Sequence, residues 1–472
     1  MKPIVRNSVF MSLFNIFGRA TGIIRYLLLA AFLSTPDYGL INFALNIGKL
    51  GRHFMDGGLD NLISRDGARD HEKVPTYCLH GLAVKSALGL LFFVGIFFYL
   101  KGTRGKSWSE LAVIYACLSG SAMVAFAGVI RSCFTAIERM EYVFYTNLPS
   151  RLISLLSLFI ILWYSWPLVL TSFSISLEFF IWFLLLAIVS FRFFSYSSIK
   201  LTLPTFRYMF LESWPLALYD FFNTFYMTLD VMMIEYMMGG SDPVAPYAYA
   251  SQLVEGFTLL LTGYLIAIYP VLSRYHETDD DAYRRLFEKS VILLLAYTLP
   301  LTFLLGIWSS EWMSLIPKAE PLTGDVLRIL IINLNLSMLN TLVIIVFTSR
   351  NRQRWLALFT GLAVVISFLT NWVFIRWYEQ VGAAFASLLS QLALFLIMSA
   401  AGRRLFALSF PLRKPLEILG ISALAGFSAW IIPFKTIFLI PFFYGAFLLL
   451  YAYLFGVFTL AELRRWRSAL KT

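Results

Sequence analysis

Long apolar windows recur along the whole chain and are separated by short polar segments. A helix needs about 20 predominantly apolar residues to cross the hydrocarbon core of a bilayer. The pattern predicts an all-α polytopic membrane protein whose fourteen spans cover approximately residues 8–34, 37–61, 78–100, 109–134, 145–164, 168–191, 208–238, 245–271, 287–310, 323–348, 355–376, 381–401, 416–433 and 437–458. No connecting segment is long enough for a folded domain, so any function must lie among the helices.

A short internal repeat organises these spans. The segment at 61–65, NLISR, closes the second predicted span, and the segment at 270–274, PVLSR, closes the eighth. Both copies begin on the same side of the membrane, which predicts a parallel repeat of two six-helix lobes related by an axis along the membrane normal. The predicted organisation is an N-terminal lobe at 1–203, a C-terminal lobe at 204–405, and two extra helices with a cytoplasmic tail at 406–472.

The first span carries two arginines inside its apolar run. Asn15, Gly18, Arg19, Gly22 and Arg25 share one helix face. An arginine deep in a bilayer costs at least about 2.5–3.5 kcal/mol unless it is paired or wetted. We interpret this face as looking into a protein cavity. The alternative is that the glycine pair packs two helices closely, and it stays open for the glycines.

The second span carries the clearest polar row. Six polar residues share an arc of about 80° on the predicted helix, namely Asn42, Asn46, Lys49, His53, Asp56 and Asp60. Arg52 lies at the edge of this arc. One interpretation is the wall of a water-filled cavity, and the other is a buried ladder of ion pairs in which Lys49 meets Asp56. Both interpretations stay open.

Acidic and neutral polar side chains replace the arginines in the later spans. Asn223 and Ser251 are predicted to line the cavity. Four acids at membrane depth are candidates for coupling a proton or a sodium ion, or for balancing arginines of the first lobe, namely Asp220, Asp230, Glu255 and Glu178.

Composition and charge fit this picture. The chain has 472 residues, of which 59% are hydrophobic and 14% are charged, whereas soluble domains carry about 25% charged residues. The formal net charge is +11. Placing both termini in the cytoplasm puts most Lys and Arg in cytoplasmic segments, so the excess charge does not indicate nucleic-acid binding. Eight basic residues remain at membrane depth, and seven of them lie in the first half: Arg19, Arg25, Lys49, Arg52, Lys85, Arg131, Arg151 and Arg328.

Motifs of catalysis are missing from the sequence. It contains no phosphate-binding Walker loop, no nucleophile elbow and no metal-ligand spacing, and its three cysteines form no disulfide framework. We therefore expect no enzyme activity, no metal and no cofactor beyond a coupling H⁺ or Na⁺.

Several segments resemble a known transporter family. The plan of six, six and two spans is similar to the multidrug/oligosaccharidyl-lipid/polysaccharide exporter superfamily. Five segments resemble the polysaccharide branch of that superfamily, the Wzx-type O-antigen flippases. They are GRATGIIR (18–25), PDYGLINFA (36–44), the NLISR and PVLSR segments, and IRSCFTAIERMEYVFYTN (130–147). The resemblance covers essentially the whole chain. It implies flipping of undecaprenyl-pyrophosphate-linked oligosaccharide units across the bacterial plasma membrane. GRATGIIR also resembles the lipid II flippases, in which first-helix arginines are implicated in pyrophosphate binding.

The resulting hypothesis is a flippase for surface polysaccharide (O-antigen, capsule or exopolysaccharide) that works by alternating access. The pyrophosphate is expected to meet Arg19, Arg25, Lys49 and Arg52, and the glycan to face Asn15, Asn42, Asn46, His53, Asn223 and Ser251. A monomer in the inner membrane is expected, in contact with membrane lipids and with polysaccharide polymerase and chain-length proteins. The alternatives are a lipid II flippase and a cation-coupled drug antiporter. A drug antiporter with cationic substrates would need an acidic cavity, so the basic residues of the first lobe argue against the antiporter alternative.

Overall fold

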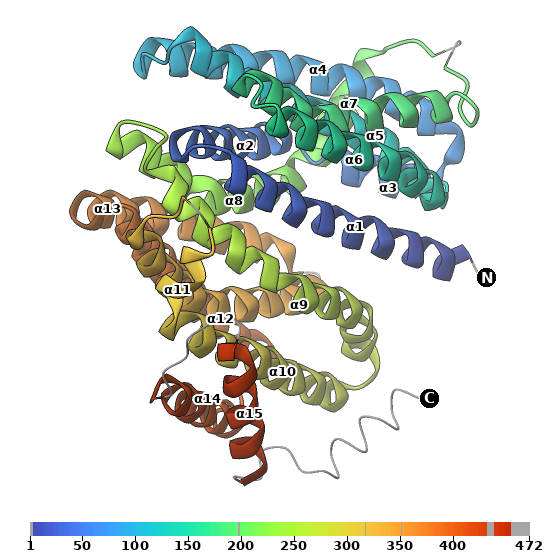
Figure 1. The fold of residues 1–472 in the computed structure, drawn as a ribbon. Helices are drawn as coiled ribbons and strands as arrows, with labels where there is room; N and C mark the ends of the chain where they lie inside the picture. The colour runs from blue at the N-terminus through green and yellow to red at the C-terminus, as the bar shows by residue number, and fades with distance from the viewer. Residues whose placement is uncertain (1–2, 197–198, 317, 351, 432–438, 455–472) are drawn as a thin grey trace. The chain divides into compact units, whose positions relative to one another are not determined.

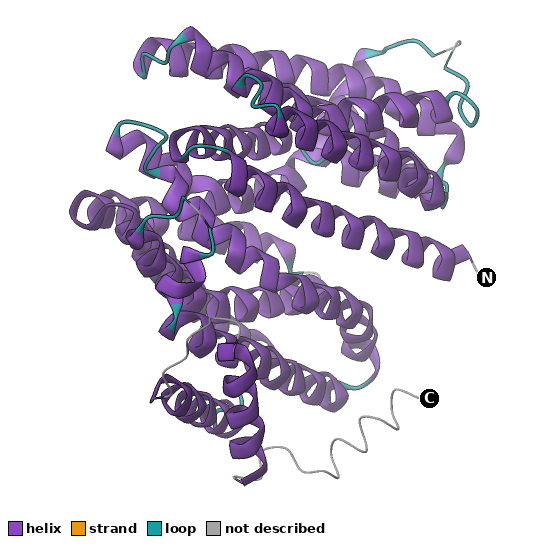
Figure 2. Ribbon diagram, viewed as in Figure 1, coloured by secondary structure: helices purple, strands orange, loops and turns teal. Residues whose placement is uncertain are grey.

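The computed structural model describes residues 3–196, 199–316, 318–350, 352–431 and 439–454. Within these ranges the regular structure is helical throughout, which confirms the predicted all-α class (Figures 1 and 2). The predicted tail beyond residue 458 lies outside the described residues. The helices are α1 (Pro3–Phe32), α2 (Thr35–Asp56), α3 (Leu59–Arg69), α4 (Val74–Phe98), α5 (Trp108–Ala136), α6 (Met140–Trp163), α7 (Leu168–Ser190), α8 (Leu203–Met238), α9 (Val244–Thr278), α10 (Asp280–Ile307), α11 (Ser309–Ser314), α12 (Pro321–Ser349), α13 (Gln353–Phe406), α14 (Arg413–Ile431) and α15 (Leu439–Leu454), with short turns of other helix types at His71–Lys73 and Tyr99–Thr103.

Helix occupies most of the described part of every predicted span, but fewer helices qualify as spans by length and composition. Eight described helices are long and apolar enough, or nine if the bent pair Val244–Thr258 and Leu261–His276 counts as one span. The polar row lowers the hydropathy of α2, and only 16 residues of α15 are described. The region from Arg354 to Phe406 is counted as one span, although two were predicted there.

The 54-residue α13 is in fact two helices. Glu379 has non-helical backbone angles (φ 53°, ψ −130°) between the two predicted spans. The ring of Phe347 lies 5.7 Å from that of Phe359 and 5.1 Å from that of Phe406. In a straight helix, residues 359 and 406 would be about 70 Å apart, so the chain must reverse direction between them. The two predicted spans are therefore the two arms of a helical hairpin.

The second predicted span is broken near its end. Gly57 and Gly58 both have left-handed backbone angles, with φ of 51° and 75°, a conformation that glycine adopts without strain. They separate α2 from α3. A Cβ on Gly58 would lie 2.4 Å from the carbonyl oxygen of Ser213 on α8. The glycine pair thus both turns the chain and lets α8 pack against the turn.

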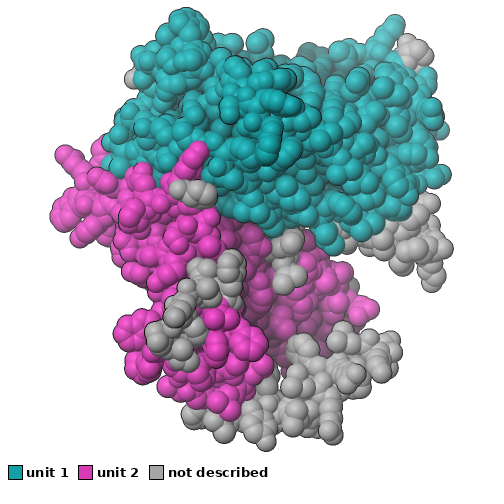
Figure 3. Space-filling view, in the orientation of Figure 1, with its two compact units in different colours: residues 1–248 teal, residues 249–472 magenta. Residues whose placement is uncertain are grey.

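The described residues pack as two compact units, 1–248 and 249–472, coloured separately in Figure 3. The first unit holds α1 to α8 and the start of α9. The lobe boundary predicted at residue 203 is a separate hypothesis about symmetry and stays a prediction.

Polar contacts hold both ends of α8 within the first unit. Near one end, the hydroxyl of Tyr208 donates to Asp66 on α3 over 2.7 Å. Burial alone would raise the pKa of Asp66, but hydrogen bonds from Arg65 and Tyr208 outweigh it and hold that pKa below its usual value. At the other end, fully buried Glu235 forms ion pairs with Arg104 (3.4 Å) and Lys106 (3.1 Å).

Candidate functional site

A charged cavity lies inside the first unit. Its volume is about 340 Å³, and each of the eight helices α1 to α8 contributes to its lining. Four basic side chains line it, Arg52, Lys85, Arg131 and Arg151, together with three acidic ones, Asp56, Asp60 and Asp220. An aromatic wall from α1 and α7 completes it, formed by Phe14, Phe179 and Trp182.

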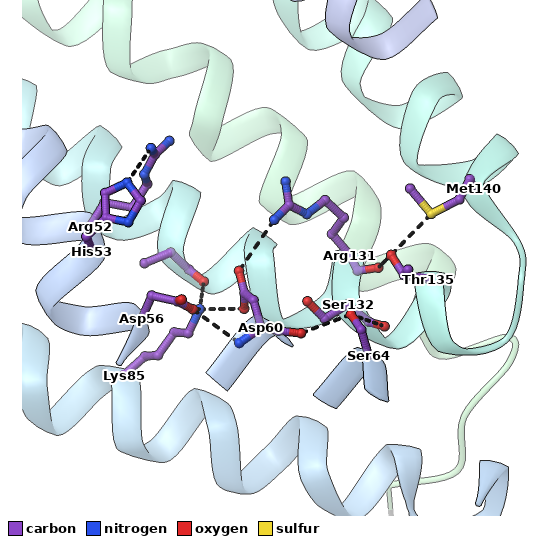
Figure 4. A network of polar contacts seen from close by, with 11 residues as sticks. Arg52, His53, Asp56, Asp60, Ser64, Lys85, Arg131, Ser132, Thr135 and Met140 are labelled. Atoms are coloured by element: carbon purple, nitrogen blue, oxygen red, sulfur yellow. Dashed lines mark hydrogen bonds and ion pairs between the residues drawn. The ribbon is translucent and has the colours of Figure 1, made fainter. Parts of the chain in front are cut away.

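Lys85 on α4 is the centre of the charge network (Figure 4). Its ammonium group lies 2.7 Å from Asp56 Oδ1, 2.7 Å from Asp60 Oδ1 and 2.9 Å from the carbonyl oxygen of Ala125. The lysine is fully buried. Three acceptors satisfy the three donors of the ammonium group, so Lys85 joins the ends of α2 and α3 to α5 across the glycine break.

Arg131 on α5 reaches the same network from another side. Its guanidinium lies 3.5 Å from the second carboxylate oxygen of Asp60. Gly128, one turn earlier on α5, provides the space, because a Cβ there would lie 2.4 Å from Asp60 Oδ2. The two acids at the glycine break are therefore committed to Lys85 and Arg131.

A second cluster fastens α1 to α6 and α7. Glu178, which is 1% exposed, pairs with Arg25 and with Arg151, the latter over 3.3 Å. Arg151 also donates to the carbonyl oxygen of Gly18 (3.2 Å) and to Thr21 Oγ1 (2.9 Å) on α1. Arg25 Nε is buried without a hydrogen-bond partner among the described residues. The Arg25 face of α1 thus packs on a buried carboxylate of its own unit.

Arg52 and Asp220 are the two charged groups of the cavity that lack an ion pair in the described part of the chain. Arg52 contacts the ring nitrogen Nε2 of neighbouring His53 over 3.0 Å. Asp220, on α8, lines the cavity and makes no side-chain hydrogen bond with any described residue. One positively charged and one acidic side chain, neither of them in an ion pair with a described residue, therefore line the same cavity.

The cavity brings together Arg52, His53 and Asp220 of the predicted site residues. The amide groups of Asn42 and Asn46 donate to backbone carbonyls one turn earlier on α2, over 3.0 and 2.9 Å. They satisfy their own helix, and neither lines the cavity.

The remaining predicted residues also lie away from it. Asp230 is buried and accepts a hydrogen bond from Tyr247 over 2.6 Å. The side chains of Asn15, Lys49 and Glu255 are exposed. Those of Arg19, Asn223 and Ser251 are partly buried. Ser251 and Glu255 belong to the second unit.

Sequence reasoning missed the main partners in the cavity. The ladder interpretation paired Asp56 with Lys49 on the same helix, but the structure pairs Asp56 with Lys85 on α4. Lys85, Arg131 and Arg151 were visible as basic residues at membrane depth, yet helical periodicity does not show which helices become neighbours. In the described ranges, no group of three or more His, Cys, Asp or Glu side chains is placed to hold a metal ion.

Two protein-family models match the sequence of this chain. The sequence model of the polysaccharide biosynthesis protein family matches residues 4–276, and that of the MatE family matches residues 215–373. A search of curated proteins found no match.

Solved structures of similar fold include the lipid II flippase MurJ in an inward closed conformation, with a TM-score of 0.74 at 14% identity over 95% of this chain and 98% of MurJ. An inward-facing multidrug resistance MATE family transporter of the MOP superfamily gives 0.69 at 15% identity over 86% of this chain and 98% of its own. A MOP superfamily transporter from Pyrococcus furiosus, described by a reverse polarity of its binding pocket, gives 0.61 at 14% identity over 86% and 96%.

These structural likenesses establish the fold, and the family follows from the sequence. A match over residues 4–276 covers more than half of the 472 residues. The chain therefore belongs to the polysaccharide biosynthesis protein family, and it has the fold of transporters of the MOP superfamily.

Proposed function

We propose that this transporter flips an undecaprenyl-pyrophosphate-linked oligosaccharide unit across the bacterial inner membrane for the synthesis of a surface polysaccharide. The observation that carries the proposal is the uncommitted guanidinium of Arg52 in a cavity lined by four basic side chains. The four basic side chains outnumber the three acidic ones in the lining, which leaves an excess positive charge to attract an anion, and arginine matches the geometry of phosphate oxygens.

Ion pairing inside the cavity singles out Arg52 as the first phosphate ligand. Lys85 and Arg131 pair with Asp56 and Asp60, and Arg151 pairs with Glu178. A phosphate would have to displace a buried carboxylate to use any of those three cations. Arg52 forms no close ion pair among the described residues, although the charges of Asp56 and Asp60 act on it from farther away, so its hydrogen-bond donors are available to an incoming anion.

The transport cycle we propose uses the whole chain. Fourteen spans form two lobes, 1–203 and 204–405, followed by the extra helices and tail at 406–472, with both termini in the cytoplasm. The pyrophosphate enters beside Arg52, the glycan occupies the polar interior, and the polyprenyl chain stays in lipid while the lobes alternate access. The protein acts as a monomer that meets the polymerase and chain-length proteins of its pathway.

Replacing Arg52 with glutamine should strongly reduce flipping. Loss of a charged hydrogen-bond donor to phosphate costs about 1.5–3 kcal/mol, or about ten- to a hundredfold in affinity. Lys49→Gln is the matched control, because Lys49 lies on the same helix but is exposed outside the cavity. The measurement is surface polysaccharide together with lipid-linked oligosaccharide at the cytoplasmic face of a deletion strain that expresses each variant at equal level.

The proposal requires that Arg52→Gln lowers surface glycan while the lipid-linked unit accumulates inside, and that Lys49→Gln does neither. If Arg52→Gln exported surface polysaccharide at the wild-type level, Arg52 would not be the phosphate ligand. If the deletion instead blocks cell-wall synthesis, the protein is a lipid II flippase, the cargo named for the MurJ structure of similar fold. If it changes only drug resistance, the antiporter alternative replaces the proposal, in line with the MatE match over residues 215–373.

Asp220 is the carboxylate we propose for proton coupling. Of the four acids considered for that role it alone lines the cavity, and it has no partner among the described residues. The groups that share this cavity with it are Arg52, His53 and Asp56 of α2, Asp60 of α3, Lys85 of α4, Arg131 of α5 and Arg151 of α6. Ionised Asp220 repels an anionic headgroup, and protonated Asp220 does not, so a proton and the phosphate should bind together.

Asp220→Asn should therefore abolish the pH dependence of headgroup binding. The wild-type protein is expected to bind the lipid-linked substrate more tightly as the pH falls, because protonation removes the repulsion. The asparagine variant should bind with the same affinity across a pH series, at the tighter, low-pH level. Binding measured on purified protein in lipid nanodiscs tests this. An unchanged pH profile in Asp220→Asn would show that another group couples the proton.

A further inference from the structure

We propose that a groove on the second unit, formed by α10, α12 and α14, binds a membrane phospholipid, with Arg328 holding its phosphate. This groove is separate from the charged cavity of the first unit, and lipid binding in it does not depend on the proposed cargo. Arg328 is the one basic residue of the second half that is predicted from the sequence to lie at or near membrane depth. No step of the proposed transport cycle uses it.

The groove has the shape and walls expected of a site for acyl chains. Its volume is about 710 Å³. Leu299 and Phe303 of α10, Ile332 and Leu336 of α12, and Leu419 of α14 supply the apolar walls. Ile332 and Leu419 remain 44% and 39% exposed in the full chain. In a membrane-spanning protein such exposed apolar side chains contact lipid.

Arg328 provides a cation with free donors at the groove. Its Nε donates to the carbonyl oxygen of Gly306 over 3.3 Å, and one Nη donates to Asp325 over 3.2 Å. The other Nη makes no hydrogen bond with a described residue. The side chain is 51% exposed. It lies seven residues into α12, about 10 Å from the start of that helix, within reach of a lipid phosphate at the membrane interface.

The groove also contains a polar atom that the protein itself leaves unsatisfied. Asn335 donates from Nδ2 to Thr302 Oγ1 over 2.8 Å, while its Oδ1 is buried without a partner in the described part of the chain. Asn335 lies two turns from Arg328 on the same face of α12. A bare acceptor of this kind is costly to leave unpaired, and a bound lipid would enclose a water molecule or a polar group against it.

Pairing with Asp325 alone does not account for Arg328. Both side chains are about half exposed, and ion pairs in such positions contribute little to stability. Arginine presents a planar fork that matches phosphate. Asp325 then acts as a competitor that weakens the hold on phosphate. This yields two substitutions with opposite expected effects, Arg328→Gln and Asp325→Asn.

The test is native mass spectrometry and lipid exchange on the full-length purified chain. The probes are phosphatidylglycerol, diacylglycerol with the same acyl chains, and inorganic phosphate. Wild-type protein should retain phosphatidylglycerol over diacylglycerol. Arg328→Gln should lower that retention about tenfold, Asp325→Asn should raise it, and Arg52→Gln should leave it unchanged. Each variant is first checked for a wild-type elution profile and thermal unfolding temperature.

Four outcomes would overturn the assignment. Equal retention of phosphatidylglycerol and diacylglycerol would show that the phosphate is not recognised. Unchanged retention of phosphatidylglycerol by Arg328→Gln would show that Arg328 does not hold the phosphate. Binding of inorganic phosphate with the affinity of the lipid would point to a free anion. Displacement of phosphatidylglycerol by stoichiometric polyprenyl phosphate would make the groove a cargo site.

Discussion

Replacing Lys85 with methionine should prevent most of the protein from folding into a stable, extractable form. The ammonium group lies 2.7 Å from carboxylate oxygens of both Asp56 and Asp60, and the lysine is fully buried. Removing one partner of a buried ion pair costs about 3–5 kcal/mol, because the other partner is left charged without compensation. That is a large share of the stability of an ordinary domain, about 5–15 kcal/mol.

The measurement is the fraction of variant protein that elutes as a single species after detergent extraction, together with its thermal unfolding temperature. Methionine keeps the length and apolar stem of lysine, so the expected loss reflects charge and not a cavity. The control is the triple variant Lys85→Met, Asp56→Asn, Asp60→Asn. Neutralising both acids removes the uncompensated charge, and this variant should recover most of the stability.

Arg131 limits how complete that recovery will be. It loses its contact with Asp60 in the triple variant, but that contact is 3.5 Å long and Arg131 is 36% exposed. Water can replace such a partner at little cost. If Lys85→Met alone unfolded at the wild-type temperature, Asp56 and Asp60 would not be held as buried ions, and the central cluster would need another explanation.

Helix positions were predictable because each span is long and apolar. The number of qualifying spans was harder to predict, for two local reasons. Two predicted spans meet at a tight turn around Glu379, and they are counted as the single helix α13 although the chain reverses direction there. In the second predicted span, the polar row lowers the hydropathy of α2, and two adjacent glycines in left-handed geometry end the helix before the predicted end of the span. A glycine pair inside a span is a visible signal of such a break.

The charged cavity was only partly predictable. Periodicity on one helix placed Arg52, His53 and Asp56 on a common side, and all three line the cavity. Their partners come from other helices, and the choice among several buried acids and bases depends on which helices become neighbours. Thus Asp56 pairs across to Lys85 and not along its own helix to Lys49. The apolar groove that contains Arg328 was not predicted, because its walls differ in no way from ordinary lipid-facing sequence.

Replacing Glu178 with leucine should destabilise the first unit to a similar extent as the Lys85 substitution. Glu178 is 1% exposed and holds both Arg25 and Arg151. Without the carboxylate, two guanidinium groups remain mostly buried near one another, which costs about 3–5 kcal/mol by the same argument. The thermal unfolding temperature of the purified variant, compared with wild type, measures the loss. A Glu178→Leu protein as stable as wild type would contradict the ion pairing.

The double variant Arg25→Gln, Glu178→Gln separates structural from functional roles of Arg25. It removes one positive and one negative charge and leaves Arg151 with its contacts to α1 and Asn147. Stability should recover in part relative to Glu178→Leu, because only one buried guanidinium, that of Arg151, remains without its carboxylate partner. If flipping returns as well, Arg25 serves only to fasten α1 to α7. If the folded double variant still fails to flip, the Arg25–Glu178 pair takes part in transport, and one arrangement that fits is that Arg25 exchanges Glu178 for the substrate phosphate. Glu178 would then be the internal anion that occupies the guanidinium when no substrate is bound.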